Sequence, residues 1–239
     1  TGQVRLAWFE WGRPGDPVVL LVHATGFHAR CWDRTVAALP AGFRVIALDM
    51  RGHGRSDKTP PYGWESFGAD LESFVAALGI RDAIGVGHSM GGHCVTHVAG
   101  RAPGTFARLL LVDPVIMDPA LYGAHRHQGF ARAEDHPVAR RRDRWSSWEE
   151  MYARFAERLP FSRWRPEVLE DYCRYGLLPD PAGDGWQLAC PGVVEASIYL
   201  GSGRTDIYGL IPVIRVPAVV LRAPGREPGD TLMDFSKSP

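Results

Sequence analysis

A glycine-rich turn at residues 87–92, Gly-His-Ser-Met-Gly-Gly, limits what this chain can fold into more than any other stretch. It follows an apolar run at 83–86 that predicts a strand, and it opens a pattern of helical spacing that extends to about Arg101. A chain that passes from strand to helix so quickly must turn sharply, and side chains at Gly87 or Gly91 would collide with the turning backbone. Ser89 would then project above the sheet, where the N-terminal amides of the helix favour an oxyanion. The turn predicts a nucleophilic serine; the alternative is a glycine-rich turn with an incidental serine.

Other apolar runs predict the strands of a single sheet. Those at 18–22, 45–48, 109–112 and 216–221 are continuous, as in strands buried on both faces, and 4–11 alternates. Helical spacing at 30–39 and 67–78 lies between them, which predicts an α/β fold: a doubly wound, mostly parallel sheet with helices on both faces. Ligand sites in such sheets lie at the carboxyl ends of the strands. Residues 23–27, 49–56, 87–92 and Asp113 all follow predicted strands, so we expect them at one site.

The alternation of strands and helices stops between residues 117 and 203. Helical spacing is clear at 148–159 and 166–175 and weaker at 188–199, which predicts a helical cap inserted into the core. We therefore expect a first core part at 1–116, a cap at 117–203 and a second core part at 204–239, ending in loop-like residues 224–239.

Composition excludes several classes of partner. The chain has 239 residues and no formal net charge, which suggests neither nucleic acid nor an anionic membrane. No apolar run approaches the length of a membrane span, and the first residues do not resemble a signal peptide. The four cysteines are scattered, so we expect free thiols and a cytoplasmic location.

Three motifs in this order give the chain a resemblance to a known family. They are His23-Ala24-Thr25-Gly26-Phe27, the glycine-rich loop 49–56, and the turn 87–91. In these, and in Val112-Asp113-Pro114 and the run 216–221, the chain resembles the α/β-hydrolase superfamily, in its lidded branch of esterases, lipases and C–C hydrolases.

The resemblance implies specific roles for four residues. Ser89 would be the nucleophile, and the amides of Thr25 and Met90 would form the oxyanion hole, although alanine at 24 leaves a shift of one residue open. Asp113 is favoured as the catalytic acid, since it follows the serine by one helix and one strand. Glu227 is the alternative acid, in a segment that departs from the usual Gly-x-x-Asp turn. The alternative role for Asp113 is that of an Asp-Pro turn residue that caps the next segment.

The catalytic histidine is the main departure from the family. In this fold it follows the serine and the acid, but the last histidine here is His136, within the expected cap. We therefore expect either a fragment that lacks a final strand, histidine loop and helix, or a complete and degenerate member. Without that histidine, the chain is expected to be nearly inactive.

The function implied is that of a serine hydrolase that cleaves a carboxylic ester or related acyl bond of a small hydrophobic substrate through an acyl-enzyme. It implies no metal and no organic cofactor. A C–C hydrolase, a cofactor-free haloperoxidase-like activity and a non-catalytic ligand-binding or scaffold protein remain alternatives.

Two other patterns favour structural roles. His93 and His97 have the spacing of a zinc motif but lack its glutamate, so we expect them to pack or cap. The arginines of 140–144 are expected on a solvated face with acidic partners, and the aromatic side chains of 145–164 in a core of the cap itself.

Overall fold

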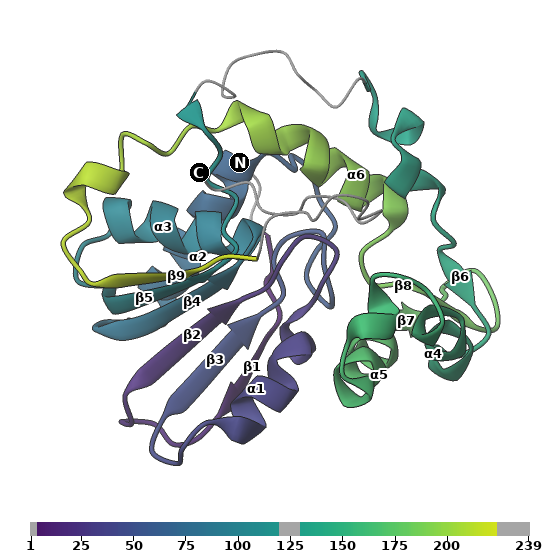
Figure 1. Cartoon of the computed structure of the whole chain (residues 1–239), viewed down its shortest axis with the longest axis horizontal. Coiled ribbons are helices and arrows are strands. Elements are labelled where there is room, and N and C mark those ends of the chain that lie inside the picture. Colours follow the sequence, from purple (N-terminus) through teal and green to yellow (C-terminus); the bar gives the residue numbers. More distant parts are fainter. Residues whose placement is uncertain (1–3, 120–129, 224–239) are drawn as a thin grey trace.

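The computed structural model describes residues 4–119 and 130–223, and its main feature is a six-stranded sheet in the order β1-β3-β2-β4-β5-β9 (Figure 1). The strands are β1 (Trp8–Trp11), β2 (Val18–Val22), β3 (Arg44–Leu48), β4 (Ala83–His88), β5 (Phe106–Val112) and β9 (Ala218–Leu221). β1 is antiparallel to β3, and the other neighbouring pairs are parallel. The predicted doubly wound, mostly parallel sheet is confirmed.

Helices cover both faces of this sheet. Leu20 and Val22 of β2 pack in one cluster with α2 (Trp64–Ala77) and α3 (Met90–Arg101). Val19 and Leu21 point to the other face, where η1 (Ala29–Trp32) and α1 (Asp33–Ala38) lie. Because both faces are buried, the strand is apolar at every position instead of alternating.

The segment between β5 and β9 forms a separate lobe, which we define as residues 144–188. It contains the helices α4 (Trp148–Ala156) and α5 (Pro166–Tyr175), as predicted, and a small sheet that was not predicted. The strands of that sheet are β6 (Arg144–Trp145), β7 (Leu177–Pro179) and β8 (Trp186–Leu188). Its aromatic residues, including Trp145 and Tyr172, build a core of its own.

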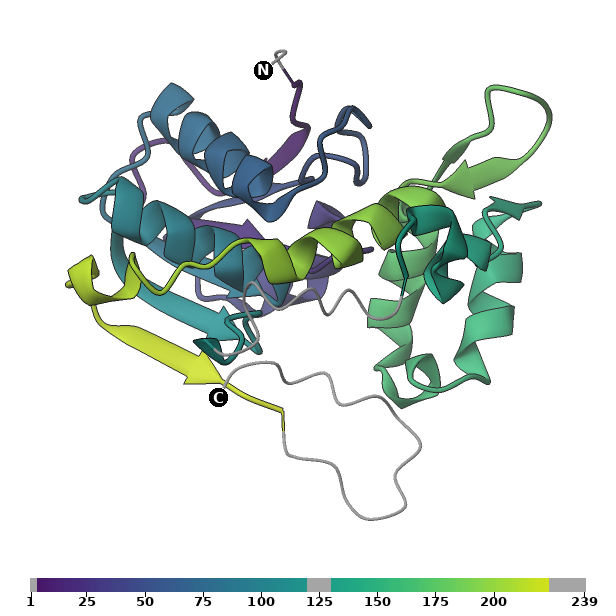
Figure 2. The ribbon, with the colours of Figure 1, turned by 90° about the horizontal axis from the view of Figure 1, so that it is seen from above.

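Helix α6 (Gly192–Gly201) joins the lobe to the main domain. Figures 1 and 2 show it running from the lobe across the region above the sheet. Val194 and Ile198 belong to the main hydrophobic core, and the Trp64 indole donates a hydrogen bond to the Ile198 carbonyl at 2.8 Å. Other short 3-10 helices among the described residues are η3 (Ala133–Asp135), η4 (Pro137–Arg140), η5 (Phe161–Arg163), η6 (Ser202–Arg204) and η7 (Ile211–Val213).

Polar contacts fix the lobe against the segment that follows β2. The Arg34 guanidinium on α1 donates two hydrogen bonds to Asp171 on α5, at 2.6 and 3.1 Å. The His28 ring lies 3.1 Å from the Tyr172 carbonyl. Among residues 4–119 and 130–223, no helix combines the length and apolar character needed to cross a membrane.

Candidate active site

Ser89 is the single residue between β4 and α3, and its backbone has a conformation that residues other than glycine rarely adopt. Its φ is 54° and its ψ is −114°. A Cβ on Gly87 would overlap the carbonyl of Gly91, and a Cβ on Gly91 would overlap the carbonyl of Val22. The sharp turn and its need for both glycines are therefore present as predicted, and strain of this kind is typical of functional sites.

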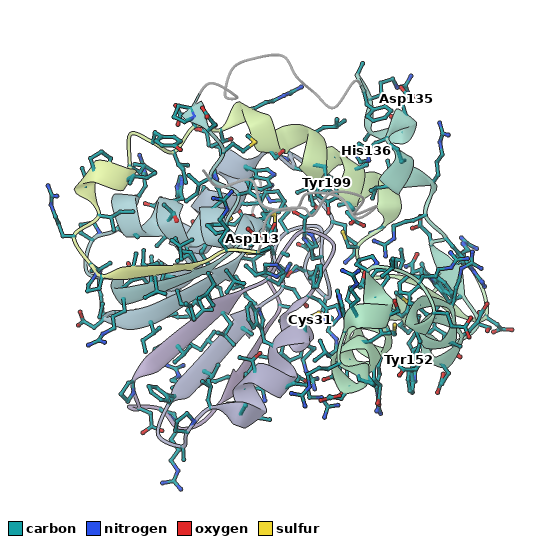
Figure 3. All side chains as sticks on the ribbon, in the orientation of Figure 1. Cys31, Asp113, Asp135, His136, Tyr152 and Tyr199 are labelled. Carbon is teal, nitrogen blue, oxygen red and sulfur yellow. The ribbon has the colours of Figure 1, made fainter. Side chains whose placement is uncertain are left out.

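The end of β5 brings Asp113 beside this turn. The Ser89 amide donates to the Val112 carbonyl at 2.9 Å, and the Val115 amide donates to the Ser89 carbonyl at 3.1 Å. Asp113 also has a positive φ, 43°, and its Oδ1 atom is buried without a hydrogen-bond partner among the described residues. Figure 3 shows Asp113 among the carboxyl ends of the strands, toward α6. A buried acceptor without a partner is costly, which marks this carboxylate for a specific donor.

The two predicted oxyanion-hole residues lie on neighbouring segments. Met90 is the first residue of α3, so its amide has no intrahelical acceptor. Thr25 lies in the buried loop after β2, and the close approach of Gly91 to the carbonyls of Val22 and His23 brings this loop against the start of α3.

Two buried histidines hold the loop that contains Thr25. The His23 Nε2 atom accepts a hydrogen bond from the Met50 amide at 2.9 Å, and the His53 Nε2 atom accepts one from the Gly26 amide at 3.0 Å. A ring nitrogen that accepts a hydrogen bond carries no proton, so both imidazole rings are neutral. The His53 Nδ1 atom is the protonated one, and it donates to the Arg51 carbonyl at 2.9 Å. Burial lowers the pKa of His23 to about 4 and lowers that of His53 well below its ordinary value. The pair therefore fixes the loop after β2 to the loop after β3.

A buried ion pair lies over the same loop. Arg141 donates hydrogen bonds to the Glu195 carboxylate and, at 3.2 Å, to the Tyr172 hydroxyl. The carboxylate lies against Gly26, where a Cβ would overlap it. Burial raises the pKa of Glu195, and Arg141 opposes that shift. The arginines of 140–144 were predicted on a solvated face, which is wrong for Arg141 because its partner comes from α6.

Aromatic side chains cover the approach to the turn. Phe27 stacks on Trp164 of the lobe at a centroid distance of 5.6 Å and meets the Tyr172 ring at 5.4 Å. The edge of its ring contacts His88, next to Ser89, at 5.7 Å. The wall beside the predicted nucleophile is therefore apolar and is shared by the core and the lobe.

No histidine of the described residues is hydrogen-bonded to the Ser89 or Asp113 side chain. His93 faces the Val115 carbonyl at 3.2 Å, and His97 lies 3.7 Å from Glu72. Among the described residues, no group of three or more histidine, cysteine, aspartate or glutamate side chains is placed to hold a metal ion. His125, His127 and the alternative acid Glu227 lie outside the described residues.

Comparison with known proteins assigns the family. The Alpha/beta hydrolase family matches residues 19–233, which is most of the chain. Strand order, the turn at Ser89 and this match together show that the chain belongs to the alpha/beta hydrolase family.

Several individual proteins are similar to parts of the chain. A non-heme chloroperoxidase from Streptomyces lividans is 41% identical over 110 residues, or 44% of this chain and 40% of that protein. A bifunctional esterase/perhydrolase from Acinetobacter calcoaceticus is 33% identical over 115 residues, or 47% of this chain and 42% of that protein. The chain therefore spans about two fifths of the length of these relatives.

Solved structures match more of the chain. A thermophilic esterase from Thermogutta terrifontis has a TM-score of 0.62 and 27% identity, covering 91% of this chain and 74% of its own. E-2-(acetamidomethylene)succinate hydrolase has a TM-score of 0.71 at 21% identity, covering 92% of this chain and 76% of its own, and this likeness shows the fold alone.

Proposed function

We propose that the protein is a serine hydrolase that cleaves a carboxylic ester or related acyl bond through an acyl-enzyme on Ser89. The observation that carries the proposal is the strained Ser89 beside the buried, unpartnered Oδ1 of Asp113. A strained serine at the head of a helix presents its hydroxyl for attack, and a carboxylate with a buried oxygen that lacks a donor is suited to orient an imidazole.

In the proposed mechanism, the Ser89 hydroxyl attacks the carbonyl carbon while a histidine takes its proton. The oxyanion that forms accepts hydrogen bonds from the amides of Thr25 and Met90, which the two buried histidines and the start of α3 hold in place. Asp113 holds the imidazole in its working tautomer. The same imidazole protonates the leaving group and then activates water to release the acid.

The proposed substrate is a small hydrophobic ester. Phe27, beside the residue that precedes Ser89, and Trp164, stacked on Phe27, offer an apolar surface for such a group. The relative named as a bifunctional esterase/perhydrolase supports chemistry at an acyl group, and the relative named as a non-heme chloroperoxidase supports the haloperoxidase-like alternative.

A non-catalytic ligand-binding role is the second candidate. It is favoured by one observation: no described histidine is bonded to Ser89 or Asp113. This candidate predicts that Ser89 does not react with acylating or phosphonylating probes.

Labelling with a fluorophosphonate, followed by peptide mass spectrometry, separates the two candidates. The adduct is expected on Ser89 and should disappear in Ser89→Ala. Ser197→Ala is the matched control, because this partly exposed serine on α6 donates its hydrogen bond within its own helix, to the Val193 carbonyl. Labelling that persists in Ser89→Ala would reject the assignment. Because the chain without the catalytic histidine is itself expected to be nearly inactive, the binding role is favoured only if labelling is also absent from a form of the protein that carries this histidine.

The catalytic acid has its own test. Asp113→Asn should lower kcat by orders of magnitude, since the amide would favour the wrong histidine tautomer, while thermal stability changes little. If Glu227→Gln is the damaging substitution instead, the acid lies on the later segment.

A further inference from the structure

A second cavity lies away from the proposed catalytic residues, between the edge of the core and the lobe. Its volume is about 440 Å³, within the range of roughly 300–1,000 Å³ that small-molecule sites occupy. None of Ser89, Thr25, Met90 or Asp113 lines it. The core contributes Phe9, Arg30 and Arg55, and the lobe contributes Trp148, Arg174 and Tyr175.

Guanidinium groups and aromatic rings alternate across this cavity. The Arg55 guanidinium carbon lies 5.7 Å from the centre of the Phe9 ring, and that of Arg30 lies 5.2 Å from the same ring. Arg30 also lies 3.9 Å from the Tyr175 ring, which Arg174 approaches to 5.8 Å. The rings of Phe9 and Tyr175 thus each lie near two guanidinium groups, and Arg30 is common to both rings. The electron-rich faces of the rings stabilise these positive charges.

Of the acidic groups around the cavity, one is held by backbone amides and another pairs with a lining arginine. Asp49, on the wall, accepts hydrogen bonds from the amides of Ala29 and Arg55 at 2.7 and 2.8 Å. Asp33 pairs with Arg30 at 2.6 Å.

The other charged or titratable groups nearby interact only weakly with the remaining arginines. Glu170 lies 3.8 Å from Arg174, at an exposed position where such a pair is weak. His28 also lines the cavity, and burial lowers the pKa of its ring, which favours the neutral form. Counted together with Asp33, Asp49 and Glu170, the three arginines leave no formal excess of charge. The Arg55 guanidinium nevertheless has no close acidic partner among the described residues, and that of Arg174 has only the weak pair with Glu170, so both remain available to a ligand.

We propose that this cavity binds an aryl anion, a flat aromatic ring that carries a carboxylate or a phosphate. The anionic group would accept paired hydrogen bonds from the guanidinium groups, which suit planar oxyanions. The ring would lie against Trp148 and Trp186, which line the same cavity. Because the core and the lobe each supply part of the wall, the bound ligand would bridge them.

Calorimetric titration of the whole chain tests the proposal with three matched probes: 2-naphthoate, 2-naphthyl phosphate and the neutral 2-naphthalenemethanol. At least one anion is expected to bind about tenfold or more tightly than the alcohol, and the tighter anion identifies the carboxylate or phosphate class. Arg55→Gln and Arg174→Gln should each weaken that anion by about tenfold.

Two control variants test whether the ligand binds in this cavity and not elsewhere. Arg163→Gln changes an exposed arginine of the lobe that does not line the cavity, and it should leave binding unchanged. Ser89→Ala should also leave binding unchanged, so this result is independent of whether the protein is a hydrolase. Equal binding of alcohol and anions, no binding at millimolar concentration, or equal affinity in the cavity variants and the control would overturn the proposal.

Discussion

Ser89 can hold its strained conformation because the residues on either side leave room for the turn. A Cβ on Gly91 would overlap the Val22 carbonyl, which belongs to a fully buried central strand and cannot move away cheaply. Gly91→Ala should therefore destabilise the fold by about 1–3 kcal/mol, as overpacking of a core does, and displace Ser89. Chemical denaturation and fluorophosphonate labelling measure both effects.

Gly183→Ala is the matched control for this prediction. A Cβ there meets no atom within 4 Å, and its backbone is not in the left-handed region. The control should be neutral or slightly stabilising. A Gly91→Ala variant as stable and as reactive as the control would show that the turn tolerates a side chain.

His23 should make stability depend on acid pH. Its ordinary pKa of about 6.5 applies to the unfolded chain, whereas burial lowers it to about 4 in the fold. Between these values the unfolded chain binds more protons, so stability falls as the pH drops from about 6.5 to about 4, by about 3 kcal/mol in all. Protonation at Nε2 would also remove the acceptor for the Met50 amide.

Urea denaturation of the unaltered protein and His23→Gln between pH 7.5 and 4.5 measures this dependence. The glutamine variant should be less stable at pH 7.5 and should lose less stability on acidification. Parallel curves for the two proteins would mean that His23 does not carry the effect.

At the scale of elements, continuous apolar runs were the reliable signal. The run at 18–22 predicts β2 because both of its faces are buried. The strands β6, β7 and β8 have two or three residues each, which is too short for any periodicity to appear. The helix α6 was weakly predicted because it packs on the core and on the segments of the insertion, which blurs its apolar stripe.

The same distinction applies to the candidate site. The turn at Ser89 is local, so its glycine spacing is visible in the sequence. The contact of Glu195 with Gly26 and its pairing with Arg141, 54 residues away, leave no such pattern. His53 offered one signal, its place at the carboxyl end of a strand, but its bond to the Gly26 amide depends on how two loops meet.

Removing Glu195 from the Arg141–Glu195 pair should destabilise the fold more than removing Arg141. Glu195→Gln leaves a largely buried guanidinium that cannot lose its proton. It should cost about 3 kcal/mol, the lower end of the range for a buried pair, because the Arg141 side chain is 21% exposed. Arg141→Met leaves a carboxylate that burial already disposes to protonate, and its cost should shrink as the pH falls. Denaturation at pH 5 and pH 8 compares the two variants.

Arg132 and Glu134 form the matched exposed pair, with side chains 73% and 59% accessible. Glu134→Gln should have little measurable effect. A similarly small effect for Glu195→Gln would mean that the pair over the Gly26 loop is not desolvated in solution.

For the whole molecule, the two edge strands of the sheet differ in how far they are exposed. β1 lies at one end of the strand order, and β9 lies at the other end. On β9 the side chains of Val219, Val220 and Leu221 are 56%, 52% and 50% exposed, in contrast to the buried β2. Exposed apolar side chains on an edge strand favour pairing with another chain.

We therefore expect the 239-residue chain to associate at high concentration through β9. A charge on an edge strand opposes such pairing, so Val220→Lys should lower the fraction of oligomer measured by light scattering or analytical ultracentrifugation. Val213→Lys is the control, because Val213 is equally exposed, at 54%, but lies in η7 and not in a strand. Both variants remove one exposed valine and add one charge, so a general gain in solubility would affect them equally. If Val213→Lys reduces association as much as Val220→Lys does, or if the unaltered chain is monodisperse at every concentration, then the β9 edge is not an association surface.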